Sequence, residues 1–174
     1  IAATDLQHKS DIGGVVLGLS DEQAVSDQFK QLLERVHHAQ PQAELLGVYI
    51  QRMAEVGQEL IIGAVQDAQF GPLVMFGSGG VEVEGLKDIS FALAPLSQRE
   101  ADEMIERTWA GKKLKGYRNL PPADRQAAAE ALLHLAQLAY DFPQILEIEI
   151  NPLRVMPKGQ GILALDARCR IKLD

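Results

Sequence analysis

Residues 59–80 read ELIIGAVQDAQFGPLVMFGSGG, and this stretch decides the fold of the chain. Two apolar runs with the residue types of β-strands, 59–65 and 72–76, flank the polar stretch 66–71. A short polar connection between two such runs is typical of neighbouring strands that pair with each other. The glycine-rich stretch 77–80 follows the second run, and glycine both weakens a strand and lets the backbone bend. We therefore predict a strand pair that ends in a flexible glycine segment.

A second pair of strand patterns lies near the end of the chain, at residues 145–150 and 162–167. Both alternate between apolar and polar residues, and the turn-forming residues 157–161 lie between them, which indicates a β-hairpin. Alternation places Glu147, Glu149 and Asn151 on one face of the first strand, and Asp166 lies at the end of its partner. Oxygen ligands that converge from two adjacent strands suit Mg²⁺. A hairpin with a solvated acidic face would show the same alternation, so the residues alone leave both interpretations open.

Helices and further strands are expected between these pairs. A helix pattern follows residues 20–22 and runs to about residue 38, and a second helix begins at a capping box from Ser97 to Glu100. Asp124 precedes a third helix, over 125–140, that is rich in Ala and Leu. Single strands are expected at 15–19, 47–53, 81–83 and 91–93, and a basic loop at 111–120. Helices mixed with strand pairs joined by short turns predict an α+β fold.

The segment from His8 to Gly14 is the first candidate for phosphate binding. Gly13 and Gly14 let the backbone approach a ligand, and successive N–H groups can cradle phosphate oxygens, although a glycine pair before a strand is more often only a turn. His8 is compatible with a surface residue, a cap or a phosphoryl acceptor, because an imidazole nitrogen is nucleophilic near neutral pH. The basic loop fits an anion site or a solvated loop equally well. The residues alone do not decide among these alternatives.

The composition of the whole chain excludes several classes of protein. Its 174 residues carry 17 Lys and Arg against 24 Asp and Glu, a net charge of −7, so it lacks the positive field that drives binding to nucleic acids or anionic membranes. No apolar run approaches the roughly 18 to 20 residues of a membrane span. Cys169 is the sole cysteine, which fits a reducing cytoplasm. The first residues do not have the pattern of a signal peptide, and the chain is interpreted as a piece of a longer protein.

Four separated segments, in the right order, resemble the ATP-grasp domain of NDP-forming acyl-CoA synthetases. The succinyl-CoA synthetase β-subunits are similar but more distant. The resemblance covers almost the whole chain and rests on 8–15, on 69–80 with Glu82, 87–88 and 94–96, on 149–153 and on 165–167.

The resemblance implies a two-lobed ATP-grasp fold of mostly antiparallel sheets with helices. Residues 1–46 would be the remainder of the N-terminal lobe, and residues 47–174 would form the C-terminal lobe with the magnesium-binding hairpin. The family's domain begins earlier than this chain, with a strand that bears a phosphate-contacting lysine. We therefore expect an N-terminally truncated domain that folds but binds nucleotide poorly by itself.

The same resemblance implies the residues of a nucleotide and Mg²⁺ site. Asn151 and Asp166 match the family's magnesium positions, with Glu149 beside them. His8 matches a histidine that relays phosphate to the nucleotide in some members. A bound ATP or ADP, or GTP or GDP, is expected to contact the glycine loop, a carboxylate and the segment where adenine lies against the backbone. These nucleotide-binding residues are Ser10, Gly13, Gly14, Tyr49, Ile50, Gln51, Met53 and Glu59.

The family's reaction is acyl-CoA + NDP + phosphate ⇌ acid + CoA + NTP, through an acyl phosphate and a phosphohistidine. The main phosphohistidine lies in a separate CoA-binding module, which nothing in this chain matches, so that module is an expected partner. An alternative is the synthetase-like regulatory part of a bacterial protein-lysine acetyltransferase. A catalytically silent binding module is a third interpretation. The acyl group and the choice between ADP and GDP are not readable from the residues.

Overall fold

The computed structural model describes residues 2–3, 13–42, 44–80 and 88–172. The chain divides into two compact units, Ile1–Ala54 and Glu55–Asp174. The division follows Ala54, whereas the sequence suggested that the first lobe ends at residue 46. Each unit is described by itself below.

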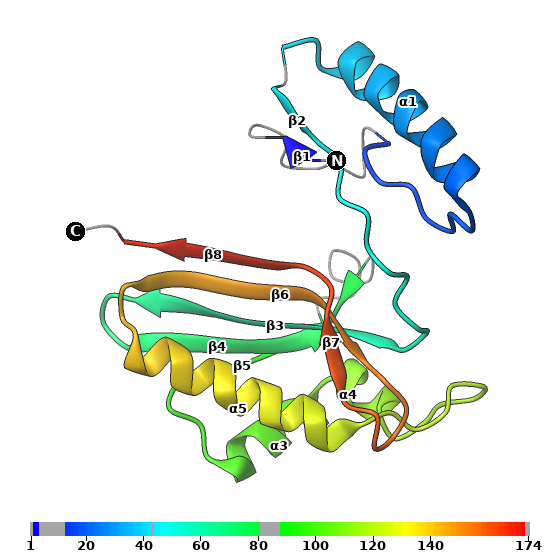
Figure 1. Cartoon of the computed structure of the whole chain (residues 1–174). Helices are drawn as coiled ribbons and strands as arrows, with labels where there is room; N and C mark the ends of the chain where they lie inside the picture. Colours follow the sequence, from blue (N-terminus) through cyan, green and yellow to red (C-terminus); the bar gives the residue numbers. More distant parts are fainter. Residues whose placement is uncertain (1, 4–12, 43, 81–87, 173–174) are drawn as a thin grey trace. The chain divides into compact units, whose positions relative to one another are not determined.

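The second unit is built on a six-stranded antiparallel sheet (Figure 1). Its strand order is β5-β4-β3-β6-β7, and β8 also pairs with β6, beyond the end of β7. Strands that are distant in the sequence are therefore neighbours, since β6 lies directly beside β3. The strands are β3 (Gln58–Asp67), β4 (Gly71–Ser78), β5 (Ile89–Leu93), β6 (Ile145–Val155), β7 (Ile162–Ala164) and β8 (Ala167–Ile171).

The hairpin of β3 and β4 confirms the strand pair that the opening stretch predicts. Pairing runs from Leu60 opposite Ser78 to Asp67 opposite Gly71. At the turn, Asp67 Oδ1 accepts hydrogen bonds from the N–H groups of Gln69 (2.8 Å) and Phe70 (2.9 Å), which hold the pKa of this carboxyl below its ordinary value. Gly71 has a φ of +79°, a conformation that glycine adopts without strain. The turn is thus specified by local chemistry.

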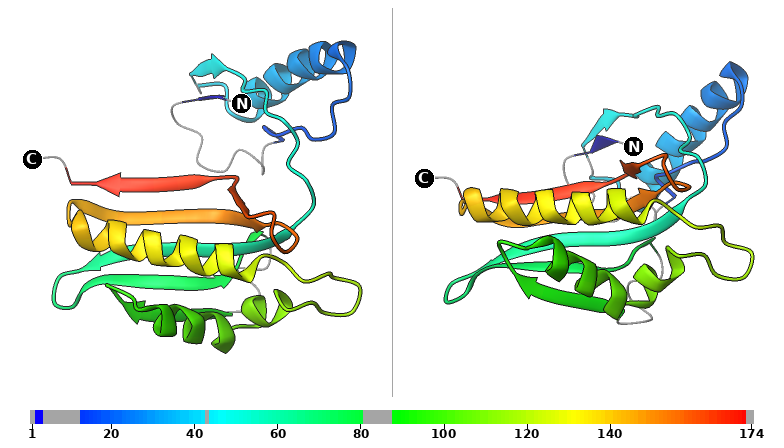
Figure 2. Two further views of the ribbon diagram at one scale, coloured as in Figure 1. Left: turned by 60° about the horizontal axis from the view of Figure 1, so that its bottom comes forward. Right: turned by 90° about the horizontal axis from the view of Figure 1, so that it is seen from below.

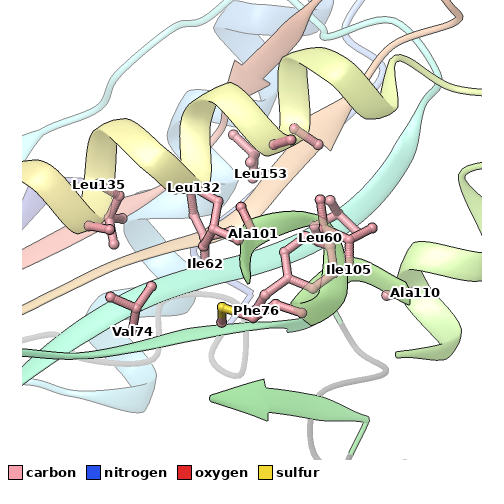
Figure 3. Close-up of a cluster of buried hydrophobic side chains, with 14 of the residues drawn as sticks. Leu60, Ile62, Val74, Phe76, Ala101, Ile105, Ala110, Leu132, Leu135 and Leu153 are labelled. Carbon is pink, nitrogen blue, oxygen red and sulfur yellow. The ribbon is translucent and has the colours of Figure 1, made fainter. Parts of the chain in front are cut away.

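Three helices lie against one face of this sheet, namely α3 (Gln98–Arg107), α4 (Trp109–Lys113) and α5 (Arg125–Asp141) (Figures 1 and 2). The core forms where alternate strand residues meet the apolar sides of α3 and α5 (Figure 3). Leu132 and Ile62 are fully buried there. The other core side chains labelled in the close-up are Leu60, Val74, Phe76, Ala101, Ile105, Ala110, Leu135 and Leu153.

The helix starts follow the predicted capping residues. Ser97 and Glu100 form the capping box, with Ser97 N–H donating to Glu100 Oε2 at 2.8 Å. Asp124 caps α5 by accepting from Ala127 N–H at 3.2 Å. The expected loop at 111–120 is partly wrong, because residues 111–113 belong to α4. Thr108 ends α3 and caps this short helix, accepting from Gly111 N–H at 3.0 Å.

The predicted hairpin near the end of the chain is confirmed in its first strand and modified in its second. Residues 162–167 do not form one continuous strand, because Leu165 and Asp166 separate β7 from β8. Both strands still pair with β6. The register of β6 against β3 shifts between Leu60 and Ile62, so that β6 contains a bulge at residues 151–152.

The first unit consists of the short strand pair β1 (Ala2–Ala3) and β2 (Leu45–Gly47) with the helix α1 (Glu22–Ala39). Asp21 caps α1 by accepting from Ala24 N–H at 2.8 Å. The strands expected at 15–19 and 47–53 are wrong, because residues 14–20 and 48–54 form no strand in the described chain. Leu17 is 70% exposed and Tyr49 is 76% exposed, so neither side chain is covered as it would be on the buried face of a sheet.

Among the described residues, no helix combines the length and the apolar character needed to cross a membrane.

Candidate functional site

The glycine segment after β4 follows a path that only glycines can take. A Cβ at Gly79 would clash with the backbone of Leu60, and Gly79 N–H donates to Glu59 O at 3.2 Å. Gly80 has a φ of +63°, and a Cβ there would clash with Glu59 Oε2. The segment therefore crosses the end of β3 in close contact with its backbone. The glycines of residues 77–80 are therefore required by packing, and the segment brings Gly80 to the edge of β6.

Gly80, Glu59 and Asn151 meet at this point, although they come from three separate parts of the chain. Gly80 N–H donates a hydrogen bond to Asn151 Oδ1 at 3.0 Å. Glu59 lies directly beside Gly80, in the space that a side chain at residue 80 would fill. A backbone donor, an amide and a carboxylate are thus held together at the bulge of β6, in an arrangement that sequence spacing alone does not reveal.

Arg154 neutralises the carboxylate of Glu59. Its Nη2 lies 2.5 Å from Glu59 Oε1, and its Nη1 donates to Glu55 O at 3.1 Å. Arg154 is directly opposite Glu59 in the pairing of β6 with β3. The side chains are 19% and 34% exposed, so solvent screens this ion pair only in part. The pair fixes the orientation of Glu59 towards Gly80.

Asp166 lies next to Asn151 in the sheet. Asn151 N–H donates to Asp166 O at 3.1 Å, and Leu165 N–H donates to Pro152 O at 3.1 Å. These two bonds hold the link between β7 and β8 against the bulge of β6. The side chain of Asp166 is 61% exposed, and Arg168 Nε lies 4.0 Å from its Oδ2. The carboxylate of Asp166 is therefore accessible to a ligand from solvent.

Glu149, the third predicted magnesium residue, is half-buried in β6 between Gly63 on β3 and Arg168 on β8. Glu147, two residues earlier, forms an ion pair with Arg170 at 3.2 Å. The acidic row that alternation predicts on β6 is thus faced by a basic row on β8. The sequence analysis missed these arginines because it ended the last strand at residue 167.

The donor set at the bulge fits Mg²⁺. Asn151 and Asp166 at the bulge, with Glu149 two residues earlier on β6, offer hard oxygen atoms, and Mg²⁺ is usually held by one or two carboxylates together with water and phosphate oxygens. Asn151 Oδ1 already accepts one hydrogen bond, from Gly80, and an amide oxygen has a second lone pair. Within the described residues, no group of three or more His, Cys, Asp and Glu side chains could hold a metal ion. An amide ligand and a nucleotide would therefore have to complete the shell.

The remaining predicted site residues belong to the first unit or lie outside the described residues. His8 and Ser10 are outside them. Gly13 has a φ of +67°, and Arg35 Nη1 lies 3.3 Å from the position that a Cβ of residue 13 would take. Gly14 is buried, whereas the predicted adenine segment is exposed, with Tyr49, Ile50, Gln51 and Met53 all open to solvent. Their contacts with a nucleotide stay predictions.

Comparison with protein families gives a match over nearly the whole chain. A family model described as an ATP-grasp domain matches residues 1–171. The chain is 42% identical, over 163 residues, to an ADP-forming acetate–CoA ligase I of Archaeoglobus fulgidus, with 94% of this chain and 24% of that protein covered. It is 39% identical, over 168 residues, to the β-subunit of an ADP-forming acetate–CoA ligase I of Pyrococcus furiosus, with 97% and 72% covered.

Solved structures give the same picture of the fold. An acetyl-coenzyme A synthetase 1 of Ca. Korarchaeum cryptofilum, in complex with coenzyme A and Ca-AMPCP, matches with a TM-score of 0.90 at 40% identity. That match covers 98% of this chain and 73% of the other. A second structure of that synthetase, with coenzyme A and Mg-AMPPCP, matches with a TM-score of 0.83 at 38% identity, covering 99% and 74%. The chain thus spans about a quarter of the Archaeoglobus ligase and about three quarters of the solved chains.

Proposed function

The chain belongs to the ATP-grasp domain family, and on this premise we propose that it is the nucleotide-binding part of an NDP-forming acyl-CoA synthetase. The cluster of Gly80, Glu59 and Asn151 beside Asp166 carries the proposal. Its oxygen atoms are the ligands that a divalent cation bound to nucleotide phosphates requires, and its backbone donor holds one of them, Asn151 Oδ1. The proposal includes magnesium, because a similar synthetase was solved with Mg-AMPPCP.

The residues of the cluster have separate tasks in this proposal. Asp166 and Asn151 hold the cation, Glu149 supports it, and Gly80 N–H keeps the Asn151 amide in place. Bound Mg²⁺ would neutralise phosphate charge and orient the phosphates for transfer. Glu59 pairs with Arg154 and borders the nucleotide, without binding the cation directly. The adenine segment, 49–53, and the phosphate loop with Ser10, Gly13 and Gly14 are further proposed nucleotide-binding residues, on the family resemblance alone.

The activity of the whole protein is part of the same proposal. The reaction is acyl-CoA + NDP + phosphate ⇌ acid + CoA + NTP, with a CoA-binding phosphohistidine module as the partner, in the same chain or in another subunit. The β-subunit name of the Pyrococcus relative supports a second subunit or module. We place the protein in the cytoplasm, as the sole cysteine suggests. The acetyltransferase alternative gains no support from the ligases described above.

Calorimetry on the full-length protein tests the site. Asp166→Ala removes a charged ligand, and we expect the affinity for Mg-ATP or Mg-GTP to fall at least tenfold, as losses in a metal shell do. Asp141→Ala is the matched control, because Asp141 is an exposed carboxylate at the end of α5 that accepts a hydrogen bond from Gln137. Unchanged affinity in Asp166→Ala would refute the proposed site.

A separate assay addresses the phosphate relay assigned to His8. His8→Ala should abolish NTP formation from acyl-CoA, NDP and phosphate, while acyl phosphate still forms from acyl-CoA and phosphate. NTP formation at the wild-type rate would make His8 a bystander. Absence of NTP formation in the wild-type protein, with acyl-CoA substrates of several chain lengths, would favour the silent binding module instead.

A further inference from the structure

We propose that Asp88 is a positioning residue of the nucleotide site, which acts on Asn151 through Ser78 and Gly80. The inference rests on the proposed function, because its effect is measured as metal-dependent nucleotide binding. Asp88 itself is not placed in contact with the ligand. It holds the strand end from which the glycine segment departs, and this segment supplies the hydrogen bond to Asn151.

The carboxylate of Asp88 joins two elements that are far apart in the sequence. Its Oδ1 accepts from Trp109 N–H at 2.7 Å, and its Oδ2 accepts from Ala110 N–H at 2.7 Å, so both oxygens bind the start of α4. Oδ2 also accepts from Ser78 Oγ at 2.8 Å, at the end of β4. Hydrogen bonds to a charged acceptor are stronger than neutral ones. The carboxylate therefore ties the end of β4 to α4.

The backbone of Asp88 reinforces this tie. Ser78 N–H donates to Asp88 O at 3.1 Å, and a Cβ at Gly77 would clash with the same carbonyl oxygen. Ser78 is 1% exposed. Asp88 thus holds Ser78 through both its main chain and its side chain, and the direction in which the backbone leaves β4 is fixed at Ser78.

Only Gly79 separates Ser78 from Gly80. Gly79 N–H donates to Glu59 O, and Gly80 N–H then donates to Asn151 Oδ1 at 3.0 Å. Functional groups have to be held within about 0.5 Å of their productive geometry to act well. A shift of the Ser78 backbone would pass directly to Gly80 and would misalign its bond to Asn151. The position of the Asn151 side chain therefore depends on Ser78, at the end of β4, and on the residue Asp88 that holds it.

Helix capping alone does not explain the arrangement. The start of α4 has a cap in Thr108, whose Oγ1 accepts from Gly111 N–H at 3.0 Å. Capping by Asp88 would need the N–H groups of Trp109 and Ala110, but it would not need Ser78. The bonds from Ser78 Oγ and Ser78 N–H are the ones that connect Asp88 to the site.

The test compares nucleotide affinity with Mg²⁺ and with EDTA in the full-length protein, using ATP, or GTP if the wild type prefers it. The dissociation constant in EDTA divided by the dissociation constant with Mg²⁺ measures the contribution of the metal. Asp88→Asn keeps the size of the side chain but puts an amide nitrogen against a backbone N–H donor. We expect the ratio to fall about 10-fold or more, as for other residues that orient metal ligands, while the affinity in EDTA stays at the wild-type value.

Ser78→Ala removes the side-chain hydrogen bond between Ser78 and Asp88 and leaves the bonds of Asp88 to α4 in place, so the ratio should fall in this variant too. If Asp88→Asn does not fold, the Ser78→Ala variant by itself tests the positioning role. The matched control is Asp124→Asn, since Asp124 also caps a helix and accepts backbone N–H groups, from Ala127 and Gly161. The control should lose stability and keep the ratio.

Three outcomes would overturn the inference. If Asp166→Ala lowers the ratio but Asp88→Asn and Ser78→Ala do not, the proposed site stands and the positioning role is wrong. If Asp124→Asn lowers the ratio as much as Asp88→Asn does, the effect reflects general stability. If Asp166→Ala leaves the ratio unchanged, the proposed function fails, and the positioning role fails with it.

Discussion

Gly80→Ala is the substitution that most directly tests the geometry of the site, and Gly71→Ala is its matched control. The two glycines lie at opposite ends of β4, and both have positive φ, +63° at Gly80 and +79° at Gly71. A Cβ at Gly80 would clash with Glu59 Oε2, whereas a Cβ at Gly71 would meet none of the described atoms within 4 Å. The pair therefore separates backbone strain from the local clash.

The expected magnitudes follow from these contacts. A left-handed backbone conformation costs a residue with a Cβ about 1–2 kcal/mol, and both variants should lose this much stability. In Gly80→Ala the carboxylate of Glu59 also has to shift, because its Oε2 occupies the space of the new Cβ, and the shift disturbs an ion pair with Arg154 worth about 1 kcal/mol. Disturbing the Gly80 bond to Asn151 removes a further contribution of about 1 kcal/mol from ligand positioning. The last loss affects nucleotide binding directly, and the displacement of Glu59, which borders the nucleotide in the proposed site, acts in the same direction.

Two measurements on the full-length protein distinguish these contributions. Urea denaturation should give a loss about 1 kcal/mol larger in Gly80→Ala than in Gly71→Ala. Calorimetry should show Mg-nucleotide affinity lowered roughly 5- to 10-fold in Gly80→Ala, the equivalent of about 1–1.4 kcal/mol, and unchanged in Gly71→Ala. Equal effects of the two variants on both stability and affinity would refute the assignment of Gly80 to the site.

Three further predictions concern the stability of the second unit, each measured by urea denaturation. Leu132→Ala should cost about 2–5 kcal/mol, because the side chain is fully buried between α5 and the sheet, and a loss below about 1 kcal/mol would contradict this packing. Ser97→Ala should cost about 1 kcal/mol by removing the capping box, and it should leave nucleotide affinity unchanged. The pKa of Asp124 is lowered, first by the hydrogen bond from Gly161 N–H, so its carboxylate stabilises the fold above the unfolded pKa, and this contribution is lost as pH falls through the lower folded pKa. The difference in free energy of unfolding between wild type and Asp124→Asn should therefore be constant above about pH 5 and shrink below the ordinary carboxyl pKa of 3.8, and a difference that does not vary with pH would contradict this.

The elements that sequence patterns predict well are those with local causes. The hairpin of β3 and β4 has its turn specified by Asp67 and Gly71, and α5 has its start specified by Asp124. The β-rich run at 15–19 and the alternation at 47–53 suggested strands wrongly, because a strand also needs a partner, and the patterns do not say whether one exists. The family resemblance supplied the candidate residues Asn151 and Asp166. The arginines of β8, which lie opposite Glu147 and Glu149, follow from strand pairing that local patterns do not show.

The bulge in β6 shows how one strand can serve both the core and the site. Ile150 and Leu153 are three residues apart, and strict alternation would turn one of them away from the helices. Both contribute to the core, Leu153 fully buried and Ile150 packed against the cluster, because the extra residue at 151–152 resets the register against β3. The shift leaves Asn151 at a point where its N–H reaches Asp166 O and its Oδ1 reaches Gly80 N–H. A polar residue is thereby held by backbone partners on both sides without a loss of core packing, which is the arrangement that a ligand-binding residue on a rigid strand requires.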